Sequence, residues 1–297
     1  MADDDITPLA SLSLTHVYYN PTDPLSTVSA FLSLLPQALC VVYVTLLWST
    51  REAEVLLMFA GQLACEAVNF VLKRLIKEER PRRLVAAGAV VGKGYGMPSS
   101  HAQFATFWAV ALGLFLCVRH RPRSRLRSSG AGRRVVVTGR NGGGGGDGAA
   151  GEPGLIDVYR AYARGGFPAT SRSIEAYSHS HWTLAQRVVV STGALLVAGL
   201  VAWSRVYLGY HSVRQVLAGC AAGTGCAGAW FAVTYLMREM GLVAWALELP
   251  PARWFRMRDL VVEEDLCQAG WEKWEEKRLL ALEREQEKKK TKDKKGQ

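Results

Sequence analysis

Positive charge is missing from the first fifty residues, which contain no Lys or Arg, although the 297-residue chain holds 36 Lys and Arg against 26 Asp and Glu. No basic segment therefore precedes the first apolar run, and a cleaved signal peptide is not expected. Cysteine is scarce as well. The six cysteines show no CxxC spacing and five lie in apolar runs, which argues against a disulfide framework or a thiolate metal centre and favours packing roles.

Long apolar runs dominate what is present. Five stretches come close to or exceed the roughly 20 mostly apolar residues that span a bilayer. The last of them is rich in Gly and Ala, which let membrane helices approach closely. The sequence therefore predicts an all-α, polytopic membrane helix bundle with about five transmembrane helices, at residues 28–48, 53–76, 101–118, 188–208 and 212–237.

Polar segments divide the chain around this core. Residues 1–27 form an N-terminal segment, and residues 28–237 form the membrane core, interrupted by a basic, glycine-rich insert at 119–186. Residues 238–297 form a tail with interfacial tryptophans and many charges. The glycine tract of the insert cannot pack a core and is expected to be disordered. An isolated run of arginines could bind nucleic acid. Because this run lies next to a span, it is expected to contact anionic lipid head groups instead.

The distribution of charge predicts an orientation. Alternation of five spans places residues 1–27, the 77–100 loop and the 209–211 turn on one side of the membrane. Arg51, the insert and the tail fall on the other side, together with most of the Lys and Arg. The positive-inside rule makes that second side cytoplasmic, so the first side is luminal and the C-terminus cytoplasmic.

Basic, serine and histidine side chains gather where spans end on the predicted luminal side. Lys73 and Arg80 are two helical turns apart and share a face. Cations near a helix C-terminus also have an ordinary explanation in the helix dipole and in snorkelling. Glu66 and Asn69, on the Lys73 face, are expected to make interhelical hydrogen bonds. The other polar residues at these ends are Ser99, Ser100, His101, Ser204, Arg205 and His211.

Two S-x-x-Q patterns, Ser100 with Gln103 and Ser212 with Gln215, predict capping boxes at the third and fifth spans. A histidine lies beside each. A helix N-terminus offers free N–H groups and a positive dipole end, which suit phosphate. Two histidines can supply a nucleophile and a proton donor for phosphoryl transfer. This face has no cluster of Asp and Glu suited to Mg²⁺, so neither a metal nor another cofactor is expected.

Three motifs carry a resemblance to a known family. They are K-x6-R-P (Lys73, Arg80, Pro81), P-S-x-H (Pro98, Ser99, His101) and S-R-x5-H (Ser204, Arg205, His211). In this order they resemble the motifs of the membrane lipid phosphate phosphatases, relatives of type 2 phosphatidic acid phosphatase and of the vanadium haloperoxidases. The stretches "PSSH", "SRVYL-x-YH-x3-Q" and "YYNPTDPLS" resemble the dolichyldiphosphatase branch more closely. The resemblance covers residues 14–118 and 187–275.

The resemblance implies roles for these residues. His211 is implied as the nucleophile that forms a phosphohistidine, and His101 as the acid that protonates the leaving group and then activates water. The wider family has an Asp four residues after the nucleophile, where this chain has Gln215. Gln215 either orients His211 or only caps the helix. The implied phosphate-binding residues are Lys73, Arg80, Ser99, Ser100 and Arg205, with Ser204 and Gln215 as supporting residues.

The function implied by the resemblance is metal-independent hydrolysis of dolichyl diphosphate to dolichyl phosphate and inorganic phosphate. It would occur at the luminal face of the endoplasmic reticulum membrane and recycle dolichyl phosphate for N-glycosylation. The expected partners are the membrane and a polyprenyl diphosphate lipid. One alternative is another lipid phosphatase, for phosphatidic acid or sphingoid phosphates. The other is a catalytically silent lipid-binding protein, against which the presence of both motif histidines argues.

Overall fold

The computed structural model describes residues 10–12, 17–81, 83–84, 90–91, 94–120, 160, 163, 182–259, 270–271, 273–281 and 283–284. The chain divides into two compact units. The first comprises Met1–Arg121 and Leu184–Glu264, and the second comprises Pro122–Thr183 and Asp265–Gln297. In the second unit the described residues at 270–284 are helical, and there Arg278 pairs with Glu275. The glycine tract predicted to be disordered lies outside the described residues.

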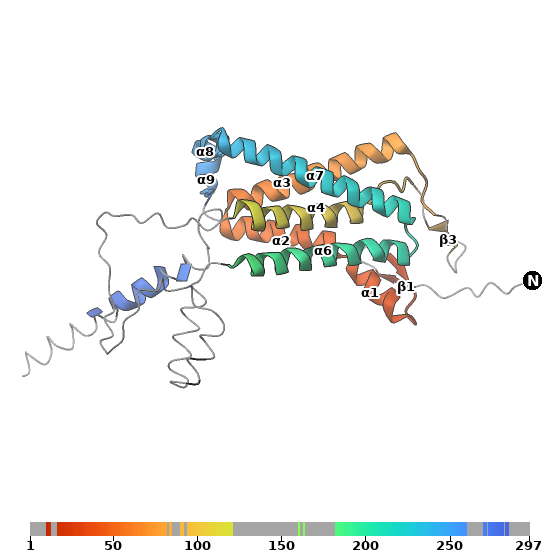
Figure 1. The fold of residues 1–297 in the computed structure, drawn as a ribbon, viewed down its shortest axis with the longest axis horizontal. Coiled ribbons are helices and arrows are strands. Elements are labelled where there is room, and N and C mark those ends of the chain that lie inside the picture. The colour runs from red at the N-terminus through yellow and green to blue at the C-terminus, as the bar shows by residue number, and fades with distance from the viewer. Residues whose placement is uncertain are drawn as a thin grey trace, which may run out of the picture. The chain divides into compact units, whose positions relative to one another are not determined.

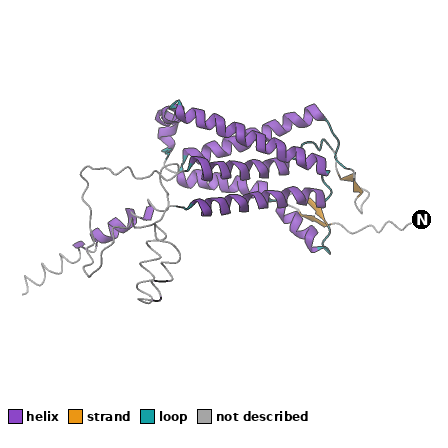
Figure 2. Ribbon diagram, viewed as in Figure 1, coloured by secondary structure: helices purple, strands orange, loops and turns teal. Residues whose placement is uncertain are grey.

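The first unit is a helix bundle (Figures 1 and 2). Two short antiparallel strand pairs accompany it, β1 (Ala10–Leu12) with β2 (Val17–Tyr19) and β3 (Arg83–Leu84) with β4 (Val90–Val91). Its helices are α1 (Pro24–Leu32), α2 (Leu35–Thr50), α3 (Ala53–Ile76), α4 (Ser100–Leu114) with the π-helix η1 (Phe115–Arg119), α6 (Leu184–Tyr207), α7 (Val213–Glu239), α8 (Leu242–Glu248) and α9 (Pro250–Phe255).

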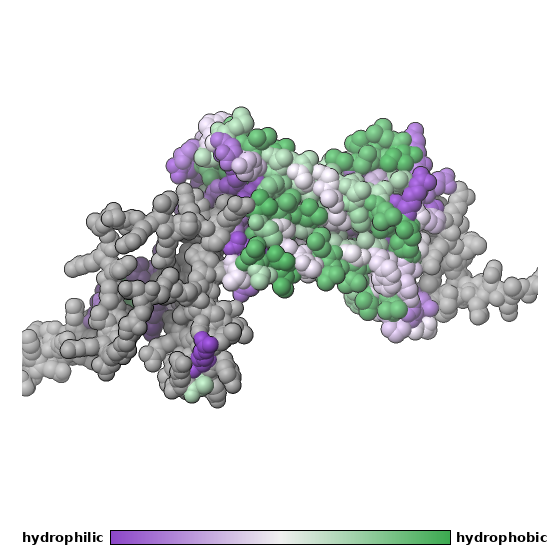
Figure 3. Space-filling view, viewed as in Figure 1, coloured by the Kyte–Doolittle hydropathy of each residue, from purple (hydrophilic) through white to green (hydrophobic). Residues whose placement is uncertain are grey.

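Among the described residues, five helical segments are long and apolar enough to cross a membrane, with α1 and α2 together forming the first. Hydrophobic side chains cover the middle of the bundle, and hydrophilic residues gather toward its two ends (Figure 3). Many large apolar residues, such as Val41, Leu75 and Leu196, are exposed. Such a surface suits lipid and not water. The predicted all-α membrane bundle with five spans is confirmed.

The helix ends differ from the predicted ones by a few residues. The first span begins at Pro24, where the Asp23 side chain accepts from the Leu25 N–H as an N-cap. It is also interrupted, because α1 ends at Leu32 and α2 starts at Leu35 with a proline in its first turn. Both predicted ends of the insert fall inside helical segments, since η1 runs to Arg119 and α6 begins at Leu184.

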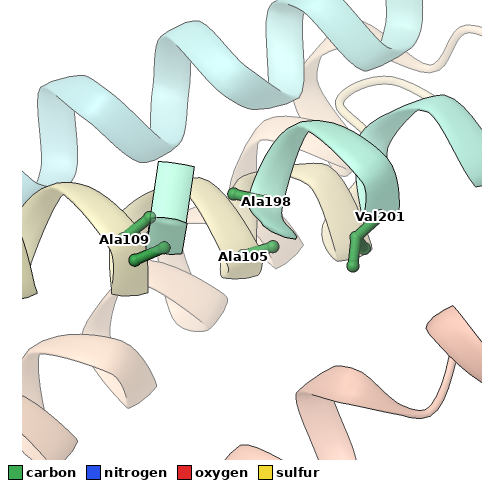
Figure 4. Packing of buried hydrophobic residues seen from close by; sticks show 5 residues of the cluster. Ala105, Ala109, Ala198 and Val201 are labelled. Carbon is green, nitrogen blue, oxygen red and sulfur yellow. The ribbon is translucent and has the colours of Figure 1, made fainter. Parts of the chain in front are cut away.

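Helix α4 is the packing centre of the bundle, in contact with α7, α6 and α3. Small side chains allow these contacts, and Figure 4 shows Ala105 and Ala109 of α4 against Ala198 and Val201 of α6. On α7, a Cβ atom at Gly219 would lie 2.6 Å from the Ser99 carbonyl oxygen. A Cβ atom at Gly223 would lie 2.5 Å from that of Gln103. The predicted close approach through small residues of the fifth span is therefore confirmed.

At the end of the bundle away from the motif residues, buried ion pairs tie helices together. The Glu54 carboxylate at the start of α3 accepts from Arg119 at the end of η1 and from Arg238 at the end of α7, both at 2.6 Å. Arg238 also pairs with Asp259. The five cysteines in the described part of the chain, Cys40, Cys65, Cys117, Cys220 and Cys226, are free, as expected.

Candidate active site

The three motifs meet at one end of the bundle. Helices α3 and α6 finish there, and α4 and α7 begin there (Figure 1). His211 lies in the turn between α6 and α7 and interacts electrostatically with Arg80, Arg205 and Lys73. His101, in the first turn of α4, interacts in the same way with Arg205, His211 and Lys73. The structure thus brings both histidines and all three cations of the motifs together.

His211 is held by the start of α7. Its Nδ1 atom lies 3.2 Å from Oε1 of Gln215, one helical turn further on, and its side chain is almost fully buried. The Ser212 hydroxyl accepts from the Gln215 N–H, and Oε1 of Gln215 accepts from the Ser212 N–H, which completes a capping box. The predicted capping box is confirmed here. Gln215 therefore caps the helix and contacts the histidine at the same time.

The other end of the Gln215 amide reaches the segment after α3. Its Nε2 atom donates to Oε1 of Glu78 at 3.0 Å and to the Glu79 carbonyl at 2.9 Å. This segment is fixed by a bridge from Glu79 to Tyr95 and by a hydrogen bond from the Gly96 N–H to the Glu78 carbonyl. A Cβ atom on Gly96 would lie 2.8 Å from Oε1 of Gln215, so a larger residue would force the amide to shift.

The start of α4 departs from the predicted cap. The helix begins at Ser100, its N-cap is Ser99, and no side chain caps it. The predicted capping box of Ser100 with Gln103 is wrong, because Gln103 points into the bundle. Its amide donates to the Cys65 carbonyl and accepts from Asn69 of α3. Asn69 thereby makes the expected interhelical bond, and the α4 N-terminus keeps N–H groups free of a side-chain cap.

Ser99 is positioned by the neighbouring helix start. Its N–H donates to the Gln215 carbonyl at 3.1 Å. Its hydroxyl oxygen is buried and has no hydrogen-bond partner among the described residues. A buried hydroxyl without a partner costs free energy unless a ligand satisfies it. Ser204 behaves differently, because its buried hydroxyl donates to the Val201 carbonyl of its own helix.

Sequence reasoning missed Ser33, which lies at the break between α1 and α2. Its hydroxyl accepts from Nη1 of Arg205 at 2.6 Å, and its backbone accepts a hydrogen bond from His101. One serine thus orients both a cation and a histidine of the motifs. The signal that could have revealed it is Pro36, which disfavours one continuous helix across "SLLPQ" and so predicts a break with free backbone groups.

The site is electrostatically positive and partly closed to water. Burial lowers the pKa of His211 to about 3, and the nearby charges of Arg80 and Arg205 act in the same direction. His211 is therefore neutral near pH 7, with a ring nitrogen able to act as a nucleophile. The Nε atoms of Arg80 and Arg205 are buried with no hydrogen-bond partner within the described residues. These donors suit an anion with several oxygen atoms.

No metal centre is evident in the part of the chain that the structure describes. No three side chains from His, Cys, Asp and Glu are grouped there in a way that could hold an ion. The arrangement instead offers cations, free N–H groups and two histidines. Such a set can bind a phosphoryl group and transfer it to nitrogen.

Comparison with known proteins agrees with this geometry. The model of the PAP2 superfamily matches residues 54–239, from the start of α3 to the end of α7. A protein of Neurospora crassa, whose name assigns it provisionally to the dolichyldiphosphatases, is 58% identical over 286 residues, 96% of this chain and 99% of its own. Dolichyldiphosphatase of Saccharomyces cerevisiae is 28% identical over 251 residues, 82% of this chain and 79% of its own.

Dolichyldiphosphatase 1 of Homo sapiens is 33% identical over 223 residues, 75% of this chain and 71% of its own. No solved structure matches the chain. The family match spans more than half of the chain and includes all the motif residues. The motif histidines and motif cations meet at one end of the membrane-helix bundle, and the relatives have this degree of similarity. The chain therefore belongs to the PAP2 superfamily.

Proposed function

We propose that the chain hydrolyses dolichyl diphosphate to dolichyl phosphate and inorganic phosphate at the luminal face of the endoplasmic reticulum membrane. The observation that carries the proposal is the meeting of neutral His211 with His101, Lys73, Arg80 and Arg205 at one end of an apolar bundle. The names of the yeast and human relatives support the substrate. The product would return to the carrier pool used for protein N-glycosylation.

In the first half of the reaction, the terminal phosphoryl group of the lipid diphosphate binds among Lys73, Arg80 and Arg205. The hydroxyl group of Ser99 and the free N–H groups of Ser100 and His101 complete the anion site. Nε2 of His211 attacks the terminal phosphorus, so the N–P bond forms while the P–O bond to dolichyl phosphate breaks. His101 donates a proton to the departing oxygen.

In the second half, His101 takes a proton from a water molecule, which attacks the phosphohistidine. The N–P bond of His211 breaks, and inorganic phosphate leaves. The three fixed cations stabilise the charge on the equatorial oxygens in both steps. Each step uses only side chains of this chain and water, so the proposed reaction needs no metal ion.

Phosphate release by the purified protein tests this function. The substrates would be a series of polyprenyl diphosphates, phosphatidic acid and sphingosine phosphate, each with EDTA present. We expect release from polyprenyl diphosphates at least as fast with the chelator as without it. Preference for phosphatidic acid or sphingosine phosphate would refute the assigned substrate, and loss of activity on chelation with recovery on Mg²⁺ would refute the mechanism.

The membrane orientation is a separate part of the proposal. Alternation of the spans and the lack of Lys and Arg before Arg51 support a luminal position for the end that holds the motif residues. An acceptor sequence for N-glycosylation, engineered into the 82–96 loop, should be modified in microsomes. The same acceptor placed in the glycine tract of the insert should stay unmodified. Modification there would mean that the chain has the opposite orientation.

A further inference from the structure

We propose that Glu78 is a positioning residue for the phosphoryl transfer, acting on His211 through the amide of Gln215. The inference rests on the function proposed above. It gives a role to Glu78, which occupies one of the unspecified positions of K-x6-R-P and is not among the defining residues of the three motifs. Its basis is a chain of hydrogen bonds from Nδ1 of His211 to Oε1 of Gln215 and from Nε2 of Gln215 to the Glu78 carboxylate.

The surrounding bonds fix which way the Gln215 amide points. Its oxygen faces the Ser212 N–H, which can only donate. Its nitrogen faces the Glu79 carbonyl and the Glu78 carboxylate, which both accept. Turning the amide over would place acceptor against acceptor and donor against donor. The oxygen therefore faces His211, and Nδ1 of His211 must carry the proton in that hydrogen bond.

This assignment determines the reactive nitrogen. With the proton on Nδ1, the lone pair of the neutral imidazole lies on Nε2. As the lone pair of Nε2 forms the bond to phosphorus, the bond from phosphorus to the leaving oxygen breaks and its electron pair stays on that oxygen. The imidazole ring becomes positive. The proton stays on Nδ1, in its bond to Gln215. The departing oxygen takes the proton that His101 donates.

A neutral amide stabilises this positive ring less than a carboxylate would. Glu78 supplies the missing negative charge, because it follows Gln215 in the chain of hydrogen bonds from His211. Its carboxylate polarises the Gln215 amide so that Oε1 becomes a better acceptor, and it adds a direct charge attraction to the imidazolium. Arg214, which lies 3.6 Å from Glu78, is mostly exposed and screened by water, so it offsets only part of this charge.

The test compares three single variants, Glu78→Gln, Glu78→Asp and Gln215→Ala. A double variant combines Glu78→Gln with Gln215→Ala. The control is Glu248→Gln, which makes the same change at an exposed glutamate. Glu248 is the last residue of α8, at the other end of the bundle, and pairs with Arg253 of α9. Thermal unfolding of each purified variant establishes that it is folded. A steady-state assay with a polyprenyl diphosphate then separates kcat from KM.

We expect Glu78→Gln to lower kcat about fivefold with little change in KM, because the charge acts on the ring as it becomes positive. Glu78→Asp should recover part of the loss, and Glu248→Gln should match the unchanged protein. In the Gln215→Ala background, Glu78→Gln should have almost no effect, because the connection is already broken. An equal effect in both backgrounds, or full activity of Glu78→Gln, would overturn the proposal.

Binding of inorganic vanadate and inorganic phosphate separates this inference from the substrate assignment. Vanadate can form a five-coordinate adduct with Nε2 and so resembles the transition state, whereas phosphate only occupies the anion site. Glu78→Gln should weaken vanadate binding severalfold and leave phosphate binding unchanged or tighter. Equal loss for both ions would overturn the inference. An unchanged protein that binds vanadate but leaves polyprenyl diphosphates intact would refute only the proposed substrate.

Discussion

Ser33→Ala removes one hydroxyl group that the three motifs do not include. The Ser33 hydroxyl accepts from Nη1 of Arg205 at 2.6 Å, and the Nε atom of the same guanidinium has no partner within the described residues. Arg205 is itself almost fully buried. A hydrogen bond to a charged group contributes about 1.5–3 kcal/mol. We therefore expect kcat/KM for a polyprenyl diphosphate to fall by about tenfold to a hundredfold.

Ser29→Ala is the matched control for this prediction. Ser29 lies one turn before Ser33, and its fully buried hydroxyl has no partner in the described part of the chain. Its removal should leave kcat/KM close to that of the unchanged protein. The contact from His101 to the Ser33 backbone remains in both variants. If Ser33→Ala is as active as Ser29→Ala, the placement of Arg205 does not depend on Ser33, and the reasoning is refuted.

Gln215→Ala should keep measurable activity, with a loss of up to about tenfold for one neutral hydrogen bond, whereas His211→Ala should have none. Equal inactivity of the two folded variants would contradict this. Gly219→Ala should cost about 1–3 kcal/mol of stability, because its methyl group meets the Ser99 carbonyl, while Gly225→Ala, which meets nothing within 4 Å, should not. Thermal unfolding that ranks the two alike would refute the packing argument. The pKa of His211 in the folded protein is about 3, below the ordinary value of about 6.5. Between these two values the unfolded chain binds a proton that the folded protein lacks, so the free energy of unfolding falls as the pH drops from about 6.5 toward about 3. Relative to His211→Asn, the unchanged protein should lose about 2 kcal/mol between pH 7 and pH 5; parallel unfolding curves would argue against a buried neutral histidine.

Much of the fold follows from local sequence, because apolar length alone defines a span and charge alone marks where it stops. The Ser212–Gln215 cap was predictable for the same reason, since both partners lie within one turn. The same pattern failed at Ser100, because Gln103 finds better partners on α3, Cys65 and Asn69. Tertiary contacts decided between two identical local patterns.

The parts of the site that sequence could not reveal depend on segments far apart in the chain. Ser33 meets Arg205 across 172 residues, and Glu78 meets Gln215 across 137. Neither residue has a spacing that marks it as functional. Ser33 needs the break between α1 and α2 to free its backbone, and Glu78 needs the bridge between Glu79 and Tyr95 to hold it beside α7.

The most direct test of the central claim is trapping of the phosphoryl enzyme. The purified protein would be quenched in alkali during turnover of a polyprenyl diphosphate labelled in its terminal phosphate, and the labelled residue would be located by peptide mapping. We predict an acid-labile label on His211, formed with EDTA present and absent from His211→Ala. Turnover without any label on His211, or with the label on another residue, would contradict nucleophilic attack by this histidine.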